Sequence, residues 1–112
     1  GEPVLSHGDA SPDQVLFDPG TGLVWLTDFD RACLAPPAVD LGSYLSMVDE
    51  DTGQALLAGY RAAAGALPDA GQLRRARTRA MLLRLADPLR AAAPDWRTQI
   101  SSGLDKLAEA IG

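Results

Sequence analysis

The sequence has almost no cysteine or histidine, the residues that form disulfides in secreted proteins and that bind zinc. Its 112 residues include one cysteine and one histidine, and only 5% are aromatic. Because Cys33 stands alone, the chain can form no internal disulfide and no cysteine-based zinc site, which fits a reducing cytosol. No apolar run approaches the length of a membrane span, and no signal-peptide pattern occurs. We therefore expect a cytoplasmic protein with no membrane partner.

Basic residues are also in the minority. The chain has 10 Lys and Arg against 15 Asp and Glu, which gives a formal net charge of −5. Nonspecific nucleic-acid binding depends mostly on Lys and Arg side chains that neutralise phosphates, so we expect no nucleic-acid partner. The length suits one domain with a modest core, and the many alanines favour helices.

The pattern of apolar and turn residues predicts short strands first and helices afterwards. Strands are expected over residues 4–6, 15–17 and 23–27. The segment 18–22 holds a proline and two glycines, so it predicts the turn of a hairpin between the last two strands. Residues 31–38 are expected to be irregular because Pro36 and Pro37 interrupt them. Helices are expected over about residues 40–48, 54–64 and 69–90, and from about residue 94 onward.

A histidine, two aspartates and a carboxamide have the spacing that kinase-type phosphoryl transfer requires. Asp9 follows His7 by two residues, and Gln14 follows Asp9 by five. A hairpin's length later, Asp28 opens an Asp-Phe-Asp sequence that ends with Asp30. In such sites one aspartate orients the attacking hydroxyl, while a carboxamide and a second aspartate hold Mg²⁺.

These motifs resemble those of the aminoglycoside phosphotransferase and choline kinase family. The family's usual signature is H-G-D-x-x-x-x-N followed by I-D-[FW]-[DEG], and Gln14 stands here in place of the usual asparagine. Residues 36–42 resemble the family's loop and its "D-L-A/G" helix start, and residues 57–61 resemble its following helix. The resemblance covers roughly the first half of the chain.

The resemblance implies an α+β fold that is mostly α: the helical C-terminal lobe of a protein-kinase-like fold. A small β-hairpin would carry the catalytic and metal-binding loops within residues 1–40, and helices would fill residues 40–112. No Gly-rich phosphate loop occurs in the chain, and nothing resembling a nucleotide lobe precedes the motif. We therefore expect residues 1–112 to be the C-terminal piece of a larger phosphotransferase, with the N-terminal lobe as its partner and little activity alone.

The resemblance also implies roles for individual residues in transfer of the ATP γ-phosphoryl group to a hydroxyl of a small molecule. Asp9 would be the catalytic base, and Gln14 and Asp28 would bind Mg²⁺. The extra methylene of Gln14 requires the loop to set back slightly, or a water to bridge. Asp13 beside it is an alternative ligand.

Three further residues are assigned by the same resemblance. Asp30 would be either another metal ligand or an ion-pair partner of Arg31. His7 would pack beneath the catalytic loop and hold it by hydrogen bonds. Asp40 would support that loop, cap the following helix, or do both.

Other interpretations of the chain remain open. The arginines between residues 74 and 90 spread around a helix, which favours a solvated, ion-paired surface over a phosphate or nucleic-acid site. The replacement at Gln14 is also consistent with a pseudokinase or a non-catalytic binding module. A plain helical interaction domain with a chance motif would leave Asp9, Gln14 and Asp28 apart in space. The identity of the acceptor is not encoded in any motif.

Overall fold

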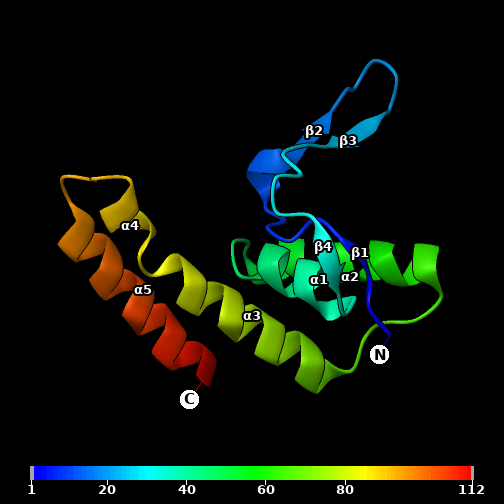
Figure 1. Ribbon diagram of the computed structural model, residues 1–112. Coiled ribbons are helices and arrows are strands. Elements are labelled where there is room, and N and C mark those ends of the chain that lie inside the picture. Colours follow the sequence, from blue (N-terminus) through cyan, green and yellow to red (C-terminus); the bar gives the residue numbers. More distant parts are fainter. Residues whose placement is uncertain (1, 112) are drawn as a thin grey trace.

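The computed structural model describes residues 2–111, which form a mostly helical α+β fold (Figure 1). The fold class predicted from the sequence therefore agrees with the structure at this level. In chain order the elements are β1 (Val4–Ser6), the 3₁₀ turn η1 (Pro12–Gln14), β2 (Val15–Phe17), β3 (Val24–Leu26), β4 (Cys33–Ala35), α1 (Ala38–Leu45), α2 (Glu50–Ala64), α3 (Ala70–Arg84), α4 (Asp87–Arg90) and α5 (Trp96–Ile111).

The strands form two separate antiparallel pairs. The predicted hairpin joins β2 to β3, with Leu16 opposite Trp25. The second pair joins β1 to β4, with Leu5 opposite Leu34. The prediction of an irregular segment over residues 31–38 is wrong for β4. That strand ends just before Pro36, where the missing proline N–H costs no ladder bond.

The turn of the β2–β3 hairpin is held by the Asp18 carboxylate. Its Oδ1 accepts from the Gly20 N–H at 2.9 Å, and its Oδ2 accepts from the Thr21 hydroxyl at 2.9 Å. The Gly20 amide first, and then the Thr21 hydroxyl, favour the charged carboxylate and lower the pKa of Asp18 below its usual 3.8. Gly22 has a φ of +73°, so the turn uses the freedom of a residue without a side chain.

Aspartates begin two of the helices, and this shifts one predicted boundary. Asp49 caps α2 by accepting from the Thr52 N–H at 2.8 Å. Residues 49–53, which lie between two of the predicted helices, therefore belong mostly to the first turn of α2. Asp69 caps α3 by accepting from the Gln72 N–H, at the residue where the sequence predicted that a helix begins. The single helix predicted over residues 69–90 divides into α3 and the short α4, which carries Pro88 in its first turn.

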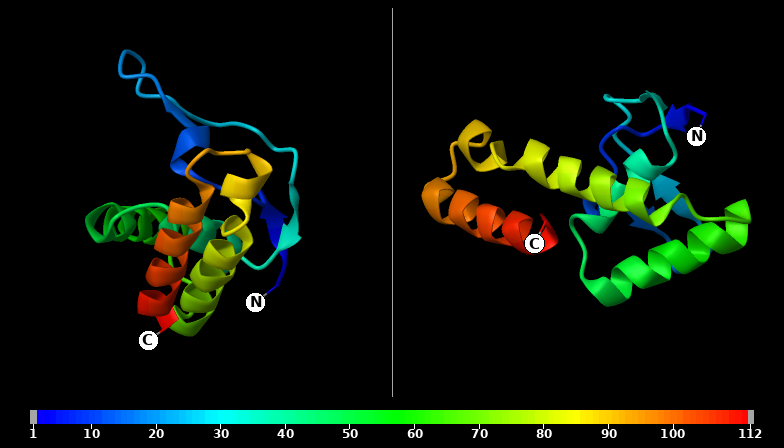
Figure 2. Two further views of the ribbon diagram at one scale, coloured as in Figure 1. Left: turned by 90° about the vertical axis from the view of Figure 1, so that its left-hand side faces the viewer. Right: turned by 90° about the horizontal axis from the view of Figure 1, so that it is seen from below.

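Two helices, α1 and α5, pack against α3, whereas α2 contacts α1 and α4 contacts α5. The α1 helix lies across α3, and α5 returns alongside it (Figure 2). Gly42 of α1 is buried where the two backbones meet. This position requires glycine, because a Cβ there would lie only 2.5 Å from the Ala76 Cβ. The closeness of α1 and α3 brings the C-terminal end of α3 to the loop that follows β1.

The β2–β3 hairpin projects away from the helices (Figures 1 and 2). The radius of gyration is 14.9 Å, whereas a compact domain of this length has about 13 Å. Leu5 and Leu34, which face each other across β1 and β4, are 80% and 73% exposed. No helix among residues 2–111 has the length and apolar character to cross a membrane.

Candidate active site

The loop His7–Asp9 after β1 is fixed by the Asp40 side chain of α1. One carboxylate oxygen accepts from the His7 N–H at 2.8 Å, and the other accepts from the Gly8 N–H at 3.0 Å. Because α1 begins at Ala38, Asp40 lies within its first turn, and the prediction that Asp40 is the helix N-cap is wrong. The carboxylate holds the loop backbone instead of the helix end.

Gly8 allows this loop to pass close to the segment after Asp28. Its φ is +91°, in the left-handed region where side chains are rare. A Cβ on Gly8 would overlap the carbonyl oxygen of Arg31. The second position of the His-Gly-Asp motif thus requires glycine for both conformation and space.

The buried imidazole of His7 connects the Asp9 backbone to the end of β3. It is 2% exposed, and its Nδ1 accepts from the Asp9 N–H at 3.2 Å. Its Nε2 lies 2.7 Å from the Thr27 carbonyl oxygen, which can only accept, so Nε2 carries the proton. The ring also packs against Phe29, with centroids 4.9 Å apart. One side chain therefore links the residue before Asp28 to Asp9.

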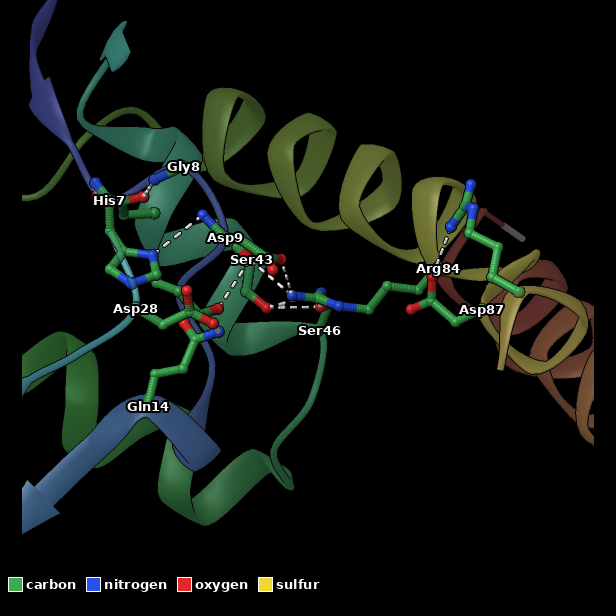
Figure 3. Close-up of polar contacts among 12 residues, drawn as sticks. His7, Gly8, Asp9, Gln14, Asp28, Ser43, Ser46, Arg84 and Asp87 are labelled. Carbon is green, nitrogen blue, oxygen red and sulfur yellow. Dashed lines mark hydrogen bonds and ion pairs between the residues drawn. The ribbon is translucent and has the colours of Figure 1, made fainter. Parts of the chain in front are cut away.

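The Asp9 carboxylate meets Arg84, which reaches back from the end of α3 (Figure 3). Arg84 Nη2 lies 3.4 Å from Asp9 Oδ1 and donates to Ser43 Oγ at 2.8 Å. Its Nη1 donates to the Ser43 carbonyl and to the Ser46 hydroxyl. Ser43 Oγ in turn donates to the Ala10 carbonyl at 2.8 Å. A network from α1 and α3 therefore encloses one face of the loop.

Gln14 and Asp28 form the second part of the arrangement. Gln14 Nε2 lies 3.5 Å from Asp28 Oδ2 (Figure 3), a long hydrogen bond. Gln14 Oε1 is buried and has no hydrogen-bond partner within residues 2–111. Asp28 has a φ of +63°, a conformation that aspartate tolerates and that often marks functional positions. A buried oxygen without a partner beside a carboxylate is an arrangement that a hard cation can complete.

The remaining acidic candidates lie apart from these contacts. Asp30 is exposed and makes no ion pair with Arg31 in the part of the chain that the structure describes. Asp13 is exposed in η1. No group of three or more His, Cys, Asp or Glu side chains that could hold a metal occurs within residues 2–111. A site here would need oxygens from a bound phosphate and water in addition to Gln14 and Asp28.

A pocket of about 280 Å³ opens beside Asp9, between the His7–Asp9 loop and the C-terminal part of α3. Asp9, Gly8 and Arg31 line one side, and Arg79, Arg84 and Asp87 line the other. Gln14 and Asp28 are not among its lining residues. The structure therefore brings Gln14 to Asp28 and turns Asp9 toward a separate cavity, while the His7 ring connects the two parts.

An aspartate facing a pocket and a carboxamide paired with a carboxylate are parts that phosphoryl-transfer enzymes use. Residues 1–80 match the model of the phosphotransferase enzyme family, and the chain belongs to that family. This confirms the resemblance that the motifs predicted and implies a kinase-type enzyme in general. No curated protein and no solved structure matches the chain.

Arg84 and Ser43 are the residues of this site that sequence reasoning missed. The arginines of α3 and α4 were expected to form a solvated surface, and that interpretation is wrong for Arg84, whose side chain is only 21% exposed. Arg84 lies 75 residues from Asp9 and outside the family match, so no local spacing connects them. The one available signal was an arginine among the leucines of a helix that ends near a proline.

Proposed function

We propose that this chain carries the acceptor-binding and metal-binding half of a kinase that transfers the γ-phosphoryl group of ATP to a hydroxyl of a small molecule. Asp9 is the catalytic base in this proposal, and Gln14 and Asp28 are the metal ligands. Family membership supports phosphoryl transfer in general, and the local contacts support these particular roles.

The observation that carries the proposal is the linkage through His7. Its ring accepts from the amide of Asp9 and donates to the carbonyl before Asp28. Two loops that lie 19 residues apart in the sequence are thereby held in one relative position. Phosphoryl transfer needs such a fixed relation, because the attacking hydroxyl and the bound phosphates must lie in line.

The chemical step assigned to Asp9 is acceptance of the hydroxyl proton. Arg84 contacts Oδ1, and Oδ2 makes no hydrogen bond within residues 2–111, so Oδ2 is available to the acceptor. As the acceptor oxygen bonds to the γ-phosphorus, the bond from that phosphorus to the bridging oxygen of ADP breaks. The proton moves to Asp9 Oδ2, and ADP leaves with the electron pair of the broken bond.

Gln14 and Asp28 fit the requirements of a magnesium-binding pair. Mg²⁺ is commonly bound by one or two protein ligands together with water and substrate phosphates, and it neutralises charge on those phosphates. The Gln14 carboxamide now presents its nitrogen to Asp28. A turn about its terminal torsion would present the orphaned Oε1 instead. Asp30 stays a candidate for a further ligand in this proposal.

Binding of Mn²⁺ in place of Mg²⁺, with inorganic pyrophosphate present to supply phosphate oxygens, tests the metal site without any turnover. The paramagnetic ion should broaden the amide NMR signals of Thr27 and Phe29 in the wild-type chain. Asp28→Asn should abolish the broadening, and Asp30→Asn is the matched control that removes the same charge two residues away. Broadening that survives Asp28→Asn unchanged would refute the assignment of Asp28. An equal loss in both variants would make Asp30 a ligand as well.

A non-catalytic binding module is the second candidate, and one contact favours it. The Gln14 N–H group directed at Asp28 already provides that carboxylate with a donor in the absence of a cation. If this contact is permanent, the side-chain NH₂ signals of Gln14 will stay unchanged at millimolar Mg²⁺. Under the kinase proposal those signals shift as the carboxamide turns.

The proposal includes a separate nucleotide-binding lobe as the partner of this chain. The 112 residues contain no Gly-rich phosphate loop, and their one lysine, Lys106, lies in α5 near the C-terminus. We therefore expect residues 1–112 alone to hydrolyse or transfer little from Mg·ATP in an ADP-release assay. Robust turnover by these residues alone would contradict the need for that lobe.

A further inference from the structure

The pocket beside Asp9 is richer in arginine than the chain as a whole. It is lined by four arginines and two aspartates: Arg31, Arg79, Arg84, Arg90, Asp9 and Asp87. The pocket thus has two more positive than negative side chains, whereas the whole chain has a net charge of −5. The side chains of the pocket are therefore net positive in a chain that is net negative.

Two of these arginines are already committed to carboxylates. Arg84 contacts Asp9 at 3.4 Å, and Arg90 contacts Asp87 at 2.7 Å. Within residues 2–111, neither Arg31 nor Arg79 has an ion-pair partner. Within each of these ion pairs the two charges cancel, so Arg31 and Arg79 are the positive side chains that can bind a ligand.

The rest of the lining limits the size and character of that ligand. Val39, Leu83 and the alanines of α3 provide an apolar wall. A volume of about 280 Å³ suits a compact metabolite better than a large one. A guanidinium binds a carboxylate or a phosphate through two parallel hydrogen bonds, and it repels an ammonium group.

We propose that the acceptor is a small hydroxy compound with an anionic group, carboxylate or phosphate. Arg79 and Arg31 bind that group, and the hydroxyl points to Asp9. This inference rests on the proposed role of Asp9, and it adds the charge of the acceptor to it. A cationic amino alcohol would bring a positive charge to two arginines without partners, so such acceptors are disfavoured.

Three-carbon compounds that differ mainly in charge test this inference directly. Glycerate and glycerol 3-phosphate are anionic, glycerol is neutral, and 2-aminopropane-1,3-diol is cationic at pH 7. Their binding to the chain is measured by two-dimensional ¹⁵N NMR titration without nucleotide or metal. We expect the better anion to bind about tenfold more tightly than glycerol, since one charged hydrogen-bonded pair supplies at least that much. The tighter of the two anions identifies the preferred group.

Two variants of α3 show whether the pocket is responsible. Arg79→Gln should weaken anion binding about tenfold and leave glycerol unaffected. Arg77→Gln removes the same charge from the same helix, but Arg77 lines other cavities, so it should retain the wild-type preference. Equal losses in the two variants, or tighter binding of the cationic compound, would overturn the inference.

The pocket experiment and the metal experiment can fail separately. Anion preference that depends on Arg79, combined with no Mn²⁺ effect at Asp28, would support the pocket and reject the kinase chemistry. Mn²⁺ binding at Asp28 with no anion preference would support the proposed metal site and reject the anion-binding pocket.

Discussion

The two oxygens of the Asp9 carboxylate have different surroundings, and this difference determines how substitutions should act. Oδ1 lies against Arg84, while Oδ2 has no hydrogen-bond partner among residues 2–111, and Asp9 lines the pocket. Asp28 contacts Gln14 and does not line that pocket. Changes at the two aspartates should therefore affect different kinetic constants.

Asp9→Asn removes the proton acceptor but keeps the shape of the side chain. In an intact kinase that includes the nucleotide-binding lobe, we expect kcat to fall about 10²- to 10⁴-fold with little change in the apparent affinity for nucleotide. Asp28→Asn should instead raise the Mg²⁺ concentration needed for half-maximal rate. Steady-state kinetics at several Mg²⁺ concentrations separate the two effects, with Asp13→Asn as the control. Equal, small effects from all three variants would show that this arrangement is not an active site.

Arg84 is expected to position Asp9 through its planar fork, so its charge alone should not suffice. Arg84→Lys keeps the charge but lacks the planar fork whose two terminal nitrogens reach Asp9, Ser43 and Ser46. We expect kcat to fall about tenfold or more with an unchanged KM for nucleotide. Arg90→Lys disturbs only an exposed pair with Asp87 and is the matched control. If Arg84→Lys and Arg90→Lys changed the kinetic constants equally, Arg84 would have no specific role in positioning Asp9.

At the scale of secondary-structure elements, the contact between α1 and α3 determines where Arg84 lies relative to the loop. Gly42 makes this contact possible, since an added Cβ would lie 2.5–2.7 Å from atoms of Ala76 and Arg77. Gly42→Ala should lower the free energy of unfolding by about 1–3 kcal/mol because the helices must separate. Gly59→Ala in α2 meets no atom within 4 Å and should stabilise the chain by about 0.5–1 kcal/mol. Urea unfolding measures the change in the free energy of unfolding for both variants. A change of the same sign in both would contradict the close packing at Gly42.

The hairpin turn should depend on pH through Asp18. Its pKa is lowered in the folded chain by the Gly20 amide and the Thr21 hydroxyl, so the carboxylate favours the turn only when charged. That contribution is present above pH 3.8, the usual pKa, and is lost as the pH falls through the lower folded value. Amide exchange at Gly20 and Thr21, relative to an unstructured peptide, should accelerate over that range. Asp18→Asn should remove this dependence; if it persists, another group is responsible.

Local chemistry in the sequence was enough to predict some elements and not others. The hairpin followed from Pro19 and the glycines of its turn, and the start of α3 followed from Asp69. The strand β4 could not be predicted, because three residues next to two prolines become a strand only by pairing with β1. The Asp40 contacts join positions more than 30 residues apart, so local chemistry could not predict them; the family resemblance did predict that Asp40 supports the loop.

On the scale of the whole molecule, the site is assembled around a small core. The buried apolar residues within 2–111 are Ala10, Ala38, Leu41, Ala80 and Leu107. No large side chain in that part is fully buried, and both strand pairs expose leucines. We therefore expect much of the stability to come from helix contacts and from the polar network around the His7–Asp9 loop. Composition alone predicted a modest core but not which polar contacts would complement it.

The distance along the chain between Asp9 and Arg84 has a consequence for the order of folding. The loop meets Asp40 across 32 or 33 residues, but it meets Arg84 across 75, and closing the longer loop costs more entropy. During synthesis, Asp40 is also available to the loop before Arg84 exists. Stopped-flow kinetics should show Asp40→Asn slowing refolding, whereas Arg84→Gln mainly speeds unfolding. Slower refolding in both would indicate simultaneous formation. If the order holds, the loop is fixed on α1 before the Asp9 carboxylate is oriented, and the contact between Asp9 and Arg84 is the first part of the site to be lost when the chain begins to unfold.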